Sequence, residues 1–224
     1  MKHTVLLFIA MSLAACSTAN KTVKEPFIVN IRSSAIQAGT IEAQFDKFLS
    51  IGGLRKYEIT LNYYPIEDAV CLRYRIDFTT YYQFWNKEGR ETFLKGLENY
   101  KEDYSQRNFG KSSNKSKRKY GTAEGYLIWQ FFQYSTRFSG NPNIEIGYFF
   151  KDKAPYFTVN QRKTEYLDPA SRTRKESPEI TMYFTRVQAD SLAAFFDQKY
   201  LQGLVTTSSD TNTDTNGNFY PDEY

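Results

Sequence analysis

The sequence of 224 residues has very little histidine and cysteine, and its N-terminal apolar run is too short to span a bilayer, which needs roughly 20 residues. Its one histidine, His3, lies in an N-terminal segment that we predict is removed. A mature chain without histidine cannot carry out Ser-His-Asp or Cys-His catalysis, and it cannot form a zinc site with histidine ligands. Enzymes that work with carboxylates alone are not excluded by this absence.

The first residues have the organisation of a secretory signal. A charged start containing Lys2 precedes an apolar run from Thr4 to Ala10, and the small residues Ala14 and Ala15 follow it. Small residues at this position are typical of a processing site. The pattern therefore predicts that the chain is exported and that residues 1–15 are a signal peptide.

The sequence Leu13-Ala14-Ala15-Cys16 resembles the lipobox of bacterial lipoproteins. The resemblance implies that the Cys16 sulfur is diacylglycerated, that the signal is cut before it, and that the new amine is acylated. It places the protein in the cell envelope, lipid-anchored to a membrane on its periplasmic or surface side, with residues 16–25 as a polar tether. The alternative is a plain cleaved signal in which Cys16 is incidental.

The composition indicates a folded domain. Hydrophobic residues make up 41% and aromatic residues 17%, which is too rich for a disordered chain. The net charge of +4 falls to +3 once Lys2 is removed, so it does not indicate a nucleic-acid partner. We expect one domain over residues 26–205 and a disordered polar tail over residues 206–224.

Cys71 is the second cysteine. If Cys16 carries lipid, Cys71 has no cysteine partner, so no intramolecular disulfide is expected. It falls in the polar register of a predicted strand beside Arg73 and Arg75, an arrangement that lowers a thiol pKa. A small residue that the strand buries is the other interpretation.

Strand and helix patterns alternate in the N-terminal half. Residues 27–31 resemble a short strand, and helical spacing from Ile41 to Leu49 predicts a helix. Alternation over residues 57–63 and 70–78 predicts a hairpin, and a Thr80-to-Gln83 capping box predicts a long helix to about residue 107. Glycines in this helix predict a kink near Gly89.

The C-terminal half is predicted to be rich in strands. The expected strands cover residues 126–138, 144–150, 156–167 and 180–184. A second capping box, Thr185 to Gln188, then begins a helix that Gly203 would end. Together the elements predict an α+β fold, an antiparallel β-sheet with helices packed on one face. A lipocalin-like β-barrel is the alternative, which the long helix near residues 81–107 disfavours.

Short stretches of the mature part resemble uncharacterised lipoproteins from spirochaetes. They are Gln83-Phe84-Trp85, Lys119-Tyr120-Gly121, Pro155-Tyr156-Phe157-Thr158 and Tyr183-Phe184-Thr185-Arg186. The resemblance covers most of the mature chain. It implies no known activity, and it therefore assigns no functional residues.

Two segments are candidate binding sites. A basic loop could bind an anionic surface or glycan; it contains Lys111, Lys115, Lys117, Arg118 and Lys119. The tail resembles a calcium-binding EF-hand loop, with oxygen ligands at Asn212, Asp214, Asn216, Asn218 and Glu223. Few carboxylates predict weak calcium affinity there, and no other cofactor is expected. A solvated loop and a disordered acidic tail are the respective alternatives.

The aromatic stretch from Tyr126 to Phe157 has apolar residues on both faces of its first strand. Such a strand is typically buried on both sides, although an exposed stacking platform for glycans is the alternative. With no catalytic motif, we expect a non-enzymatic binding module for an envelope protein or glycan. The alternative is a glycan-acting hydrolase that uses two carboxylates, which a cleft lined by Trp85 or Trp129 would favour.

Overall fold

The computed structural model describes residues 26–46, 53–109, 116–132, 136–151, 154–166 and 175–211. Its helices are α1 (Lys87–Ser105), α2 (Arg186–Phe196) and α3 (Gln198–Thr211). Its strands are β1 (Ile36–Asp46), β2 (Leu54–Tyr64), β3 (Ala69–Ile76), β4 (Thr79–Trp85), β5 (Lys117–Glu124), β6 (Tyr126–Phe131), β7 (Arg137–Gly140), β8 (Asn143–Lys151), β9 (Ala154–Gln161), β10 (Thr164–Glu165), β11 (Glu176–Ser177) and β12 (Ile180–Phe184). No helix in these ranges is both long and apolar enough to cross a membrane.

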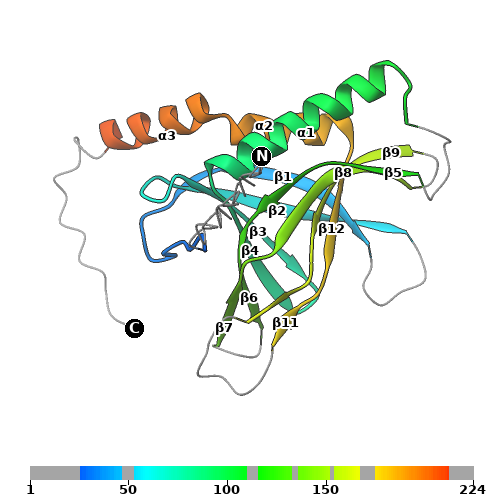
Figure 1. The fold of residues 1–224 in the computed structure, drawn as a ribbon. Coiled ribbons are helices and arrows are strands. Elements are labelled where there is room, and N and C mark those ends of the chain that lie inside the picture. The colour runs from blue at the N-terminus through cyan, green and yellow to red at the C-terminus, as the bar shows by residue number, and fades with distance from the viewer. Residues whose placement is uncertain are drawn as a thin grey trace, which may run out of the picture.

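Ten of the strands form one antiparallel sheet that curls into a half-barrel (Figure 1). Their order is β5-β8-β9-β12-β1-β2-β3-β4-β6-β7, and β10 and β11 form a separate ribbon. The expectation of a mostly antiparallel sheet with helices is confirmed. The order is open, with β5 and β7 at its edges, so the described strands do not close into the lipocalin-like barrel.

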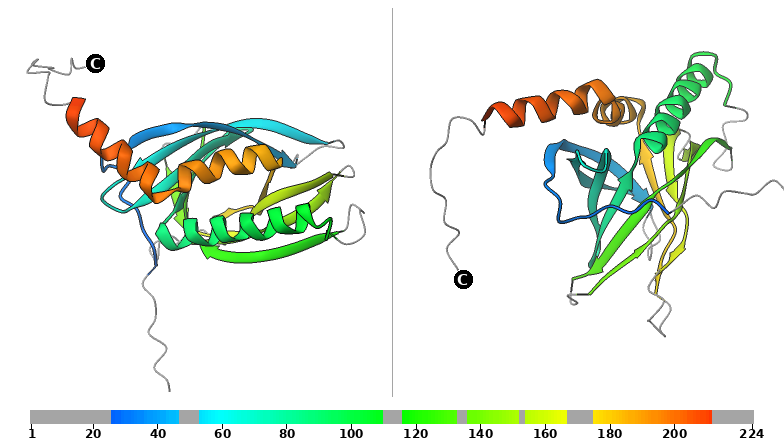
Figure 2. Two further views of the ribbon diagram at one scale, coloured as in Figure 1. Left: turned by 90° about the horizontal axis from the view of Figure 1, so that it is seen from above. Right: turned by 60° about the vertical axis from the view of Figure 1, so that its left-hand side comes forward.

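The three helices lie across one end of the half-barrel, and the sheet bends into two arms beneath them (Figure 2). One arm contains β3, β4, β6 and β7, and the other contains β5, β8, β9 and β12. The ribbon joins the arms on one side, since a Cβ at Gly140 of β7 would lie 2.5 Å from the Glu165 carbonyl oxygen of β10. The opposite end of the half-barrel, away from the helices, stays open.

The predicted hairpin over residues 57–63 and 70–78 is confirmed as β2 and β3. Leu61 pairs with Leu72, and Ile59 pairs with Tyr74, so the apolar residues of both strands share the interior face. Alternation is a reliable signal here because the interior face is buried along the pair, whereas Arg73 and Arg75 on the other face of β3 are exposed.

The helix predicted from Ile41 to Leu49 is wrong. Residues 36–46 are β1, and Ile41, Ala43 and Phe45 alternate into the core. Two of the residues that matched helical spacing, Ile41 and Phe45, also match a period of two. Pairing with β2 along nearly all of β1 decides between the two periods.

The helix predicted from Thr80 begins later. Thr79–Trp85 is β4, which pairs with β3 and β6, and helix α1 begins at Lys87. The N-cap is Asn86, whose side chain accepts a hydrogen bond from the Gly89 N–H at 2.8 Å. Gly89 therefore lies in the first turn of the helix, and no kink forms there.

Three other predicted boundaries are wrong. Residues 126–138 form two strands, β6 and β7, that fold back on each other. The strand predicted over 156–167 ends at Gln161 as β9. Residues 27–31 pair with none of the described strands; they pack against the outside of the sheet, where the Asn141 side chain donates to the Phe27 carbonyl at 2.7 Å.

The second capping box is confirmed. The Thr185 side chain accepts from the Gln188 N–H, and the Gln188 side chain accepts from the Thr185 N–H. The helix breaks at Asp197, and α3 then continues past Gly203, so the predicted C-cap at Gly203 is wrong. Nothing lies within 4 Å of a Cβ placed at Gly203.

The main core lies between the helices and the interior face of the sheet. Phe93 of α1 contacts Phe157 of β9 and Phe196 of α2, with ring centroids 5.3 and 4.8 Å apart. Gly96 lets α1 approach β8 closely, because a Cβ there would lie 2.6 Å from Ile146 Cγ2. Burial of these rings is the main favourable contribution to the free energy of folding at this end.

A buried arginine joins three distant segments beneath the helices. The Arg90 side chain is 1% exposed, and its guanidinium donates to the Asp68 carboxylate at 2.8 Å and to Gln198 Oε1 at 2.6 Å. It also donates to the main-chain carbonyls of Asp68 and Trp85. These bonds compensate for the cost of taking the charge out of water.

Candidate functional site

A cavity of about 810 Å³ lies at the open end of the half-barrel, and we call it the mouth cavity. Its apolar wall comes from several strands: Phe45 of β1, Ile76 of β3, Tyr81 of β4, Phe131 of β6 and Ile180 of β12. The remaining lining residues are Asp46, Asp77, Thr79, Lys163, Glu176, Ser177, Pro178, Glu179 and Thr181.

The alternation of the strands explains why apolar side chains line this cavity. Phe45 and Ile180 belong to the same interior rows as the core residues Ala43 and Met182. At the helix-covered end these rows meet apolar side chains of the helices. At the mouth no described helix covers the rows, and their last side chains border the cavity.

Carboxylates surround the mouth cavity, and most have a cationic partner. Asp46 accepts a hydrogen bond from the Tyr183 hydroxyl at 2.5 Å and forms an ion pair with Lys151. Glu176 pairs with Lys163 at 2.6 Å, and Glu179 pairs with Arg162 at 2.8 Å. The rim is therefore polar and largely charge-balanced.

Buried polar side chains form a hydrogen-bonded chain from the core to the wall of the cavity. Trp85 Nε1 donates to Gln83 Oε1 at 3.0 Å, and Gln83 Nε2 donates to Gln161 Oε1 at 3.0 Å. Gln161 Nε2 donates to Ser177 Oγ at 3.3 Å, and the Tyr74 hydroxyl donates to Gln161 Oε1 at 3.4 Å. We call these five residues the polar chain.

The polar chain supports the wall of the cavity from inside the protein. All of its members are buried, and buried polar groups are costly unless they are hydrogen-bonded. Ser177 Oγ accepts from Gln161 and donates to the Pro178 carbonyl at 3.3 Å. Because Ser177 is fully buried, its hydroxyl is held within the wall and is not exposed to a ligand.

Tyrosine hydroxyls in and beside the cavity stay protonated at neutral pH. Burial raises the pKa of Tyr81 from 10.0 to about 12. Burial and the hydrogen bond to Asp46 raise the pKa of Tyr183 further. These groups are neutral hydrogen-bonding groups, and they are unsuited to act as general bases near pH 7.

The sequence pattern missed the polar chain. Gln83 shares the interior face of β4 with Tyr81 and Trp85. Gln161 shares the interior face of β9 with Phe157 and Val159. A glutamine at an interior position of a strand is a signal that could have found them. Interpreting Gln83 as part of a helix cap removed that signal.

The predicted basic loop is only partly within the described residues. Lys111 and Lys115 lie outside them, whereas Lys117, Arg118 and Lys119 begin strand β5. Lys119 lies 3.7 Å from the Glu145 carboxylate. The anionic-surface hypothesis for the whole set stays a prediction.

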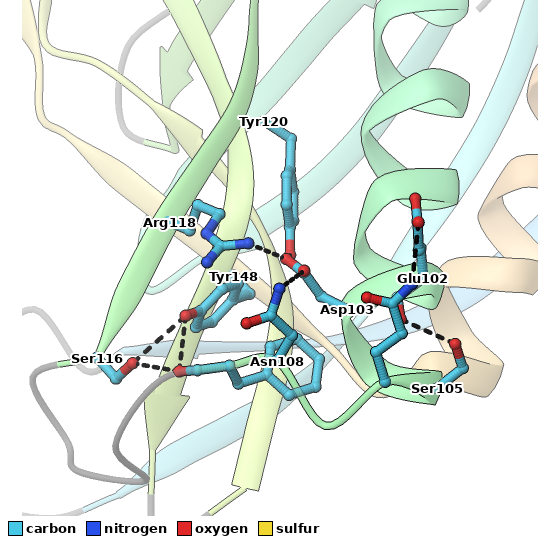
Figure 3. Close-up of polar contacts among 10 residues, drawn as sticks. Glu102, Asp103, Ser105, Asn108, Ser116, Arg118, Tyr120 and Tyr148 are labelled. Carbon is cyan, nitrogen blue, oxygen red and sulfur yellow. Dashed lines mark hydrogen bonds and ion pairs between the residues drawn. The ribbon is translucent and has the colours of Figure 1, made fainter.

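Arg118 has a structural contact at the end of helix α1 (Figure 3). Its guanidinium donates to Asp103 Oδ2 at 2.6 Å, and the Tyr120 hydroxyl donates to the same oxygen at 2.6 Å. Nearby, Ser116 and Tyr148 both donate to the Phe109 carbonyl, at 2.7 and 2.8 Å. These bonds fix both ends of the segment that contains the basic loop.

Cys71 is fully buried, which confirms the interpretation as a small buried residue. Burial raises the pKa of its thiol well above the usual range, and Arg73 offsets only part of that effect. The prediction of a lowered thiol pKa is wrong, because desolvation of the thiolate outweighs the attraction of Arg73.

The calcium loop over residues 212–223 and the lipidation site Cys16 lie outside the described residues. Within the described ranges, no group of three or more His, Cys, Asp or Glu residues is placed to hold a metal ion. Both sites stay predictions from the sequence.

The aromatic strand is divided between core and surface. Trp129 is buried, as the core interpretation expects, and Trp85 is buried as well. Phe132 is 71% exposed and Phe131 is 37% exposed, whereas Tyr134 lies outside the described residues. Neither tryptophan lines the mouth cavity, so the cleft expected of a glycan-acting hydrolase is only partly matched.

A second hollow of about 440 Å³ lies over β5, β8, β9 and β12. It is lined mainly by polar and charged side chains, among them Lys119 with Glu145 and Arg162 with Glu179. Because these charges pair with one another, they are less available to a ligand. The mouth cavity is therefore the stronger candidate site.

Comparison with known proteins places the chain among sequences without an assigned activity. A family model described as an uncharacterised Treponema protein matches residues 18–203. The comparisons with curated proteins and with solved structures returned no match.

Proposed function

The chain belongs to this family of uncharacterised Treponema proteins, which supplies no activity, and we propose that it is a non-enzymatic binding module of the cell envelope. Its binding site is the mouth cavity, and its ligand is a small amphipathic molecule. The observation that carries this proposal is a cavity of about 810 Å³ that combines an apolar wall with a polar rim.

The size and lining of the cavity support a small-molecule ligand. Typical ligand sites have volumes of about 300–1,000 Å³ and mostly apolar walls with few polar groups. The mouth cavity, at about 810 Å³, lies within this range of volumes and has an apolar wall, and its rim is polar. An envelope protein or glycan is the broader partner proposal, but the apolar wall of the cavity favours the apolar part of a smaller ligand.

Attachment to the envelope is proposed from the sequence at Cys16. Three acyl chains would exceed the two signals that stable anchoring needs. Intact mass of the protein extracted from membranes tests this part of the proposal. A mass that shows no acyl addition at Cys16 would contradict the proposed anchor. It would not affect the proposed binding site.

Binding in the mouth cavity is tested with N-phenylnaphthylamine, a neutral fluorophore whose emission rises in apolar surroundings. Ile76→Glu introduces a charge into the cavity wall at a partly exposed strand end, so the fold should tolerate it. We expect the dissociation constant to rise at least about tenfold, because the carboxylate is desolvated when the probe binds.

Ile66→Glu is the matched control, because Ile66 is 80% exposed in the turn between β2 and β3 and does not line the cavity. Its dissociation constant should equal that of the parent. Unchanged probe binding by the Ile76→Glu variant would contradict the cavity as the binding site, provided circular dichroism shows that it is folded.

A carboxylate-dependent hydrolase is the second candidate function, because Asp46, Asp77, Glu176 and Glu179 line the same cavity. Three of these carboxylates form ion pairs with lysine or arginine, which is typical of structural pairs rather than of a free acid–base pair. Release of reducing ends from envelope glycan by the parent, abolished in the Asp77→Asn variant, would favour the hydrolase.

A further inference from the structure

Two neighbouring turns beside the mouth cavity carry exposed phenylalanine side chains. Phe78 and Phe132 are each 71% exposed, and the Phe132 N–H donates to the Phe78 carbonyl at 2.7 Å. Phe131, next to Phe132, is 37% exposed and lines the cavity. We call Phe78, Phe131 and Phe132 the mouth-tip aromatics.

The mouth-tip aromatics are held in place by the chain around them. The hydrogen bond between Phe132 and Phe78 joins the turns that follow β3 and β6. The Arg75 guanidinium lies 4.8 Å from the Phe132 ring centroid and donates through Nε to the Asp77 carbonyl at 3.1 Å. Two exposed rings and a guanidinium thus share a defined arrangement at the end of one arm.

The arm that carries these rings has few charges, and most of them are positive. Its strands and turns, residues 69–85 and 126–140, contain Arg73, Arg75, Arg137 and Asp77 as their charged residues. All four are exposed. The arm therefore combines protruding aromatic rings with a net charge of +2, although charged residues make up 24% of the whole chain.

We propose that the mouth tip is a docking site for a lipid bilayer whose surface carries anionic headgroups. Phenylalanine side chains on protruding turns can enter the headgroup region, and arginines keep their guanidinium groups at its surface. Anionic lipid attracts the positive arm. A protein partner would instead need a matching pocket for each protruding ring.

This surface is separate from the proposed lipid anchor, and the proposal does not require a ligand in the mouth cavity. The two sites are nevertheless adjacent, because Phe131 belongs to both. A bilayer bound at the mouth tip would therefore lie against the entrance of the cavity.

Vesicle sedimentation of the mature chain tests the docking site. The chain carries Cys16→Ser so that it has no lipid, and the vesicles contain phosphatidylcholine alone or phosphatidylcholine with phosphatidylglycerol. Because Trp85 and Trp129 are both buried, sedimentation is a better readout than tryptophan fluorescence. The parent should bind the vesicles with phosphatidylglycerol, and binding should weaken as salt is added.

Variants separate the apolar and charged contributions. Phe78→Ser with Phe132→Ser should reduce the bound fraction at least fivefold on vesicles with phosphatidylglycerol. Arg75→Gln with Arg137→Gln should remove most of the difference between the two vesicle compositions. Ile66→Ser with Val187→Ser is the matched control, because these side chains are 80% and 70% exposed elsewhere, and it should bind like the parent.

The proposal would be overturned if the phenylalanine variant and the parent bound vesicles equally. It would also be overturned if the control variant lost as much vesicle binding as the phenylalanine variant. A parent that binds neither kind of vesicle would also overturn it and would leave a protein partner as the occupant. Binding of N-phenylnaphthylamine by the same variants distinguishes the two proposals, because loss of bilayer docking should leave the cavity able to take the probe.

Discussion

At the helix-covered end of the half-barrel the interior rows of the sheet meet a second layer of apolar side chains, whereas at the mouth the same rows border a cavity. Trp85 and Phe93 contact Phe196 from helix α2 at the covered end, and all three are buried. Phe45 and Tyr81 are also buried, because both rings contact Tyr74, but they lie at the border of the cavity as well. Strand alternation alone therefore makes an apolar interior at both ends, and the helices determine which end is covered.

The largest contrast between the two ends should appear when one phenylalanine is truncated at each. Phe93→Ala removes a ring from the packed end and should lower the free energy of unfolding by about 3–5 kcal/mol. Phe78→Ala at the mouth tip should change it by less than about 0.5 kcal/mol. Urea unfolding followed by circular dichroism measures both. Similar losses for the two variants would contradict the division into a packed end and an open end.

Alkaline pH should weaken the fold through the tyrosine in the cavity wall. The pKa of Tyr81 is raised from 10.0 to about 12 by burial, so between these values the folded chain keeps a proton that the unfolded chain has released. The associated stability is complete below pH 10 and is lost as the pH rises through about 12, a change of roughly 3 kcal/mol.

Unfolding by urea at a series of pH values measures this loss. The Tyr81→Phe variant keeps the ring and removes the titrating group, so its stability should fall less steeply over the same range. An identical pH dependence in the parent and the variant would exclude Tyr81 as a contributor.

The polar chain connects the two ends, and breaking it should have an intermediate effect. Gln161→Leu leaves Gln83, Tyr74 and Ser177 without a shared partner and should cost about 2 kcal/mol in the free energy of unfolding. Adding Gln83→Leu should cost less than the sum of the single changes, because the two side chains bond to each other. A strictly additive double variant would show that the chain does not act as a unit.

The smallest expected effects come from two helical glycines. Gly96→Ala places a Cβ 2.6 Å from Ile146 Cγ2, so the strain should outweigh the gain in helix propensity and destabilise the protein by about 1 kcal/mol. Gly203→Ala meets nothing within 4 Å and should stabilise it by up to about 1 kcal/mol. Thermal unfolding measures both, and shifts of the same sign would contradict this assignment of close packing.

Local sequence patterns correctly predicted those elements for which a single pattern was present and agreed with the observed strand pairing or helix cap. The alternation over residues 70–78 and the capping box at Thr185 are examples, since each depends on neighbours within a few residues. Ile41 and Phe45 fit both a helix and a strand, and only pairing with β2 separates the two. Thr80 and Gln83 matched a capping box, yet the interior positions of Tyr81 and Trp85 make this segment a strand.

The candidate site could not be predicted because it is assembled from distant segments. Its wall joins Phe45 of β1 to Ile180 of β12, and the polar chain joins Gln83 to Gln161. Each contact depends on a pairing that spans a large part of the chain, such as β1 with β12. A single sequence gives the interior face of each strand, but it does not give the order of the strands in the sheet.

The bonds of Arg90 also set a condition on when the protein can complete its fold. The guanidinium joins Asp68, 22 residues earlier, to Gln198, 108 residues later. Until the start of α3 is available, this charge lacks one of its partners and its burial is unfavourable. A nascent or partly exported chain therefore cannot finish the covered end, and such long-range closure slows folding. For a chain predicted to be exported, late completion delays the compact state until almost the whole chain is present.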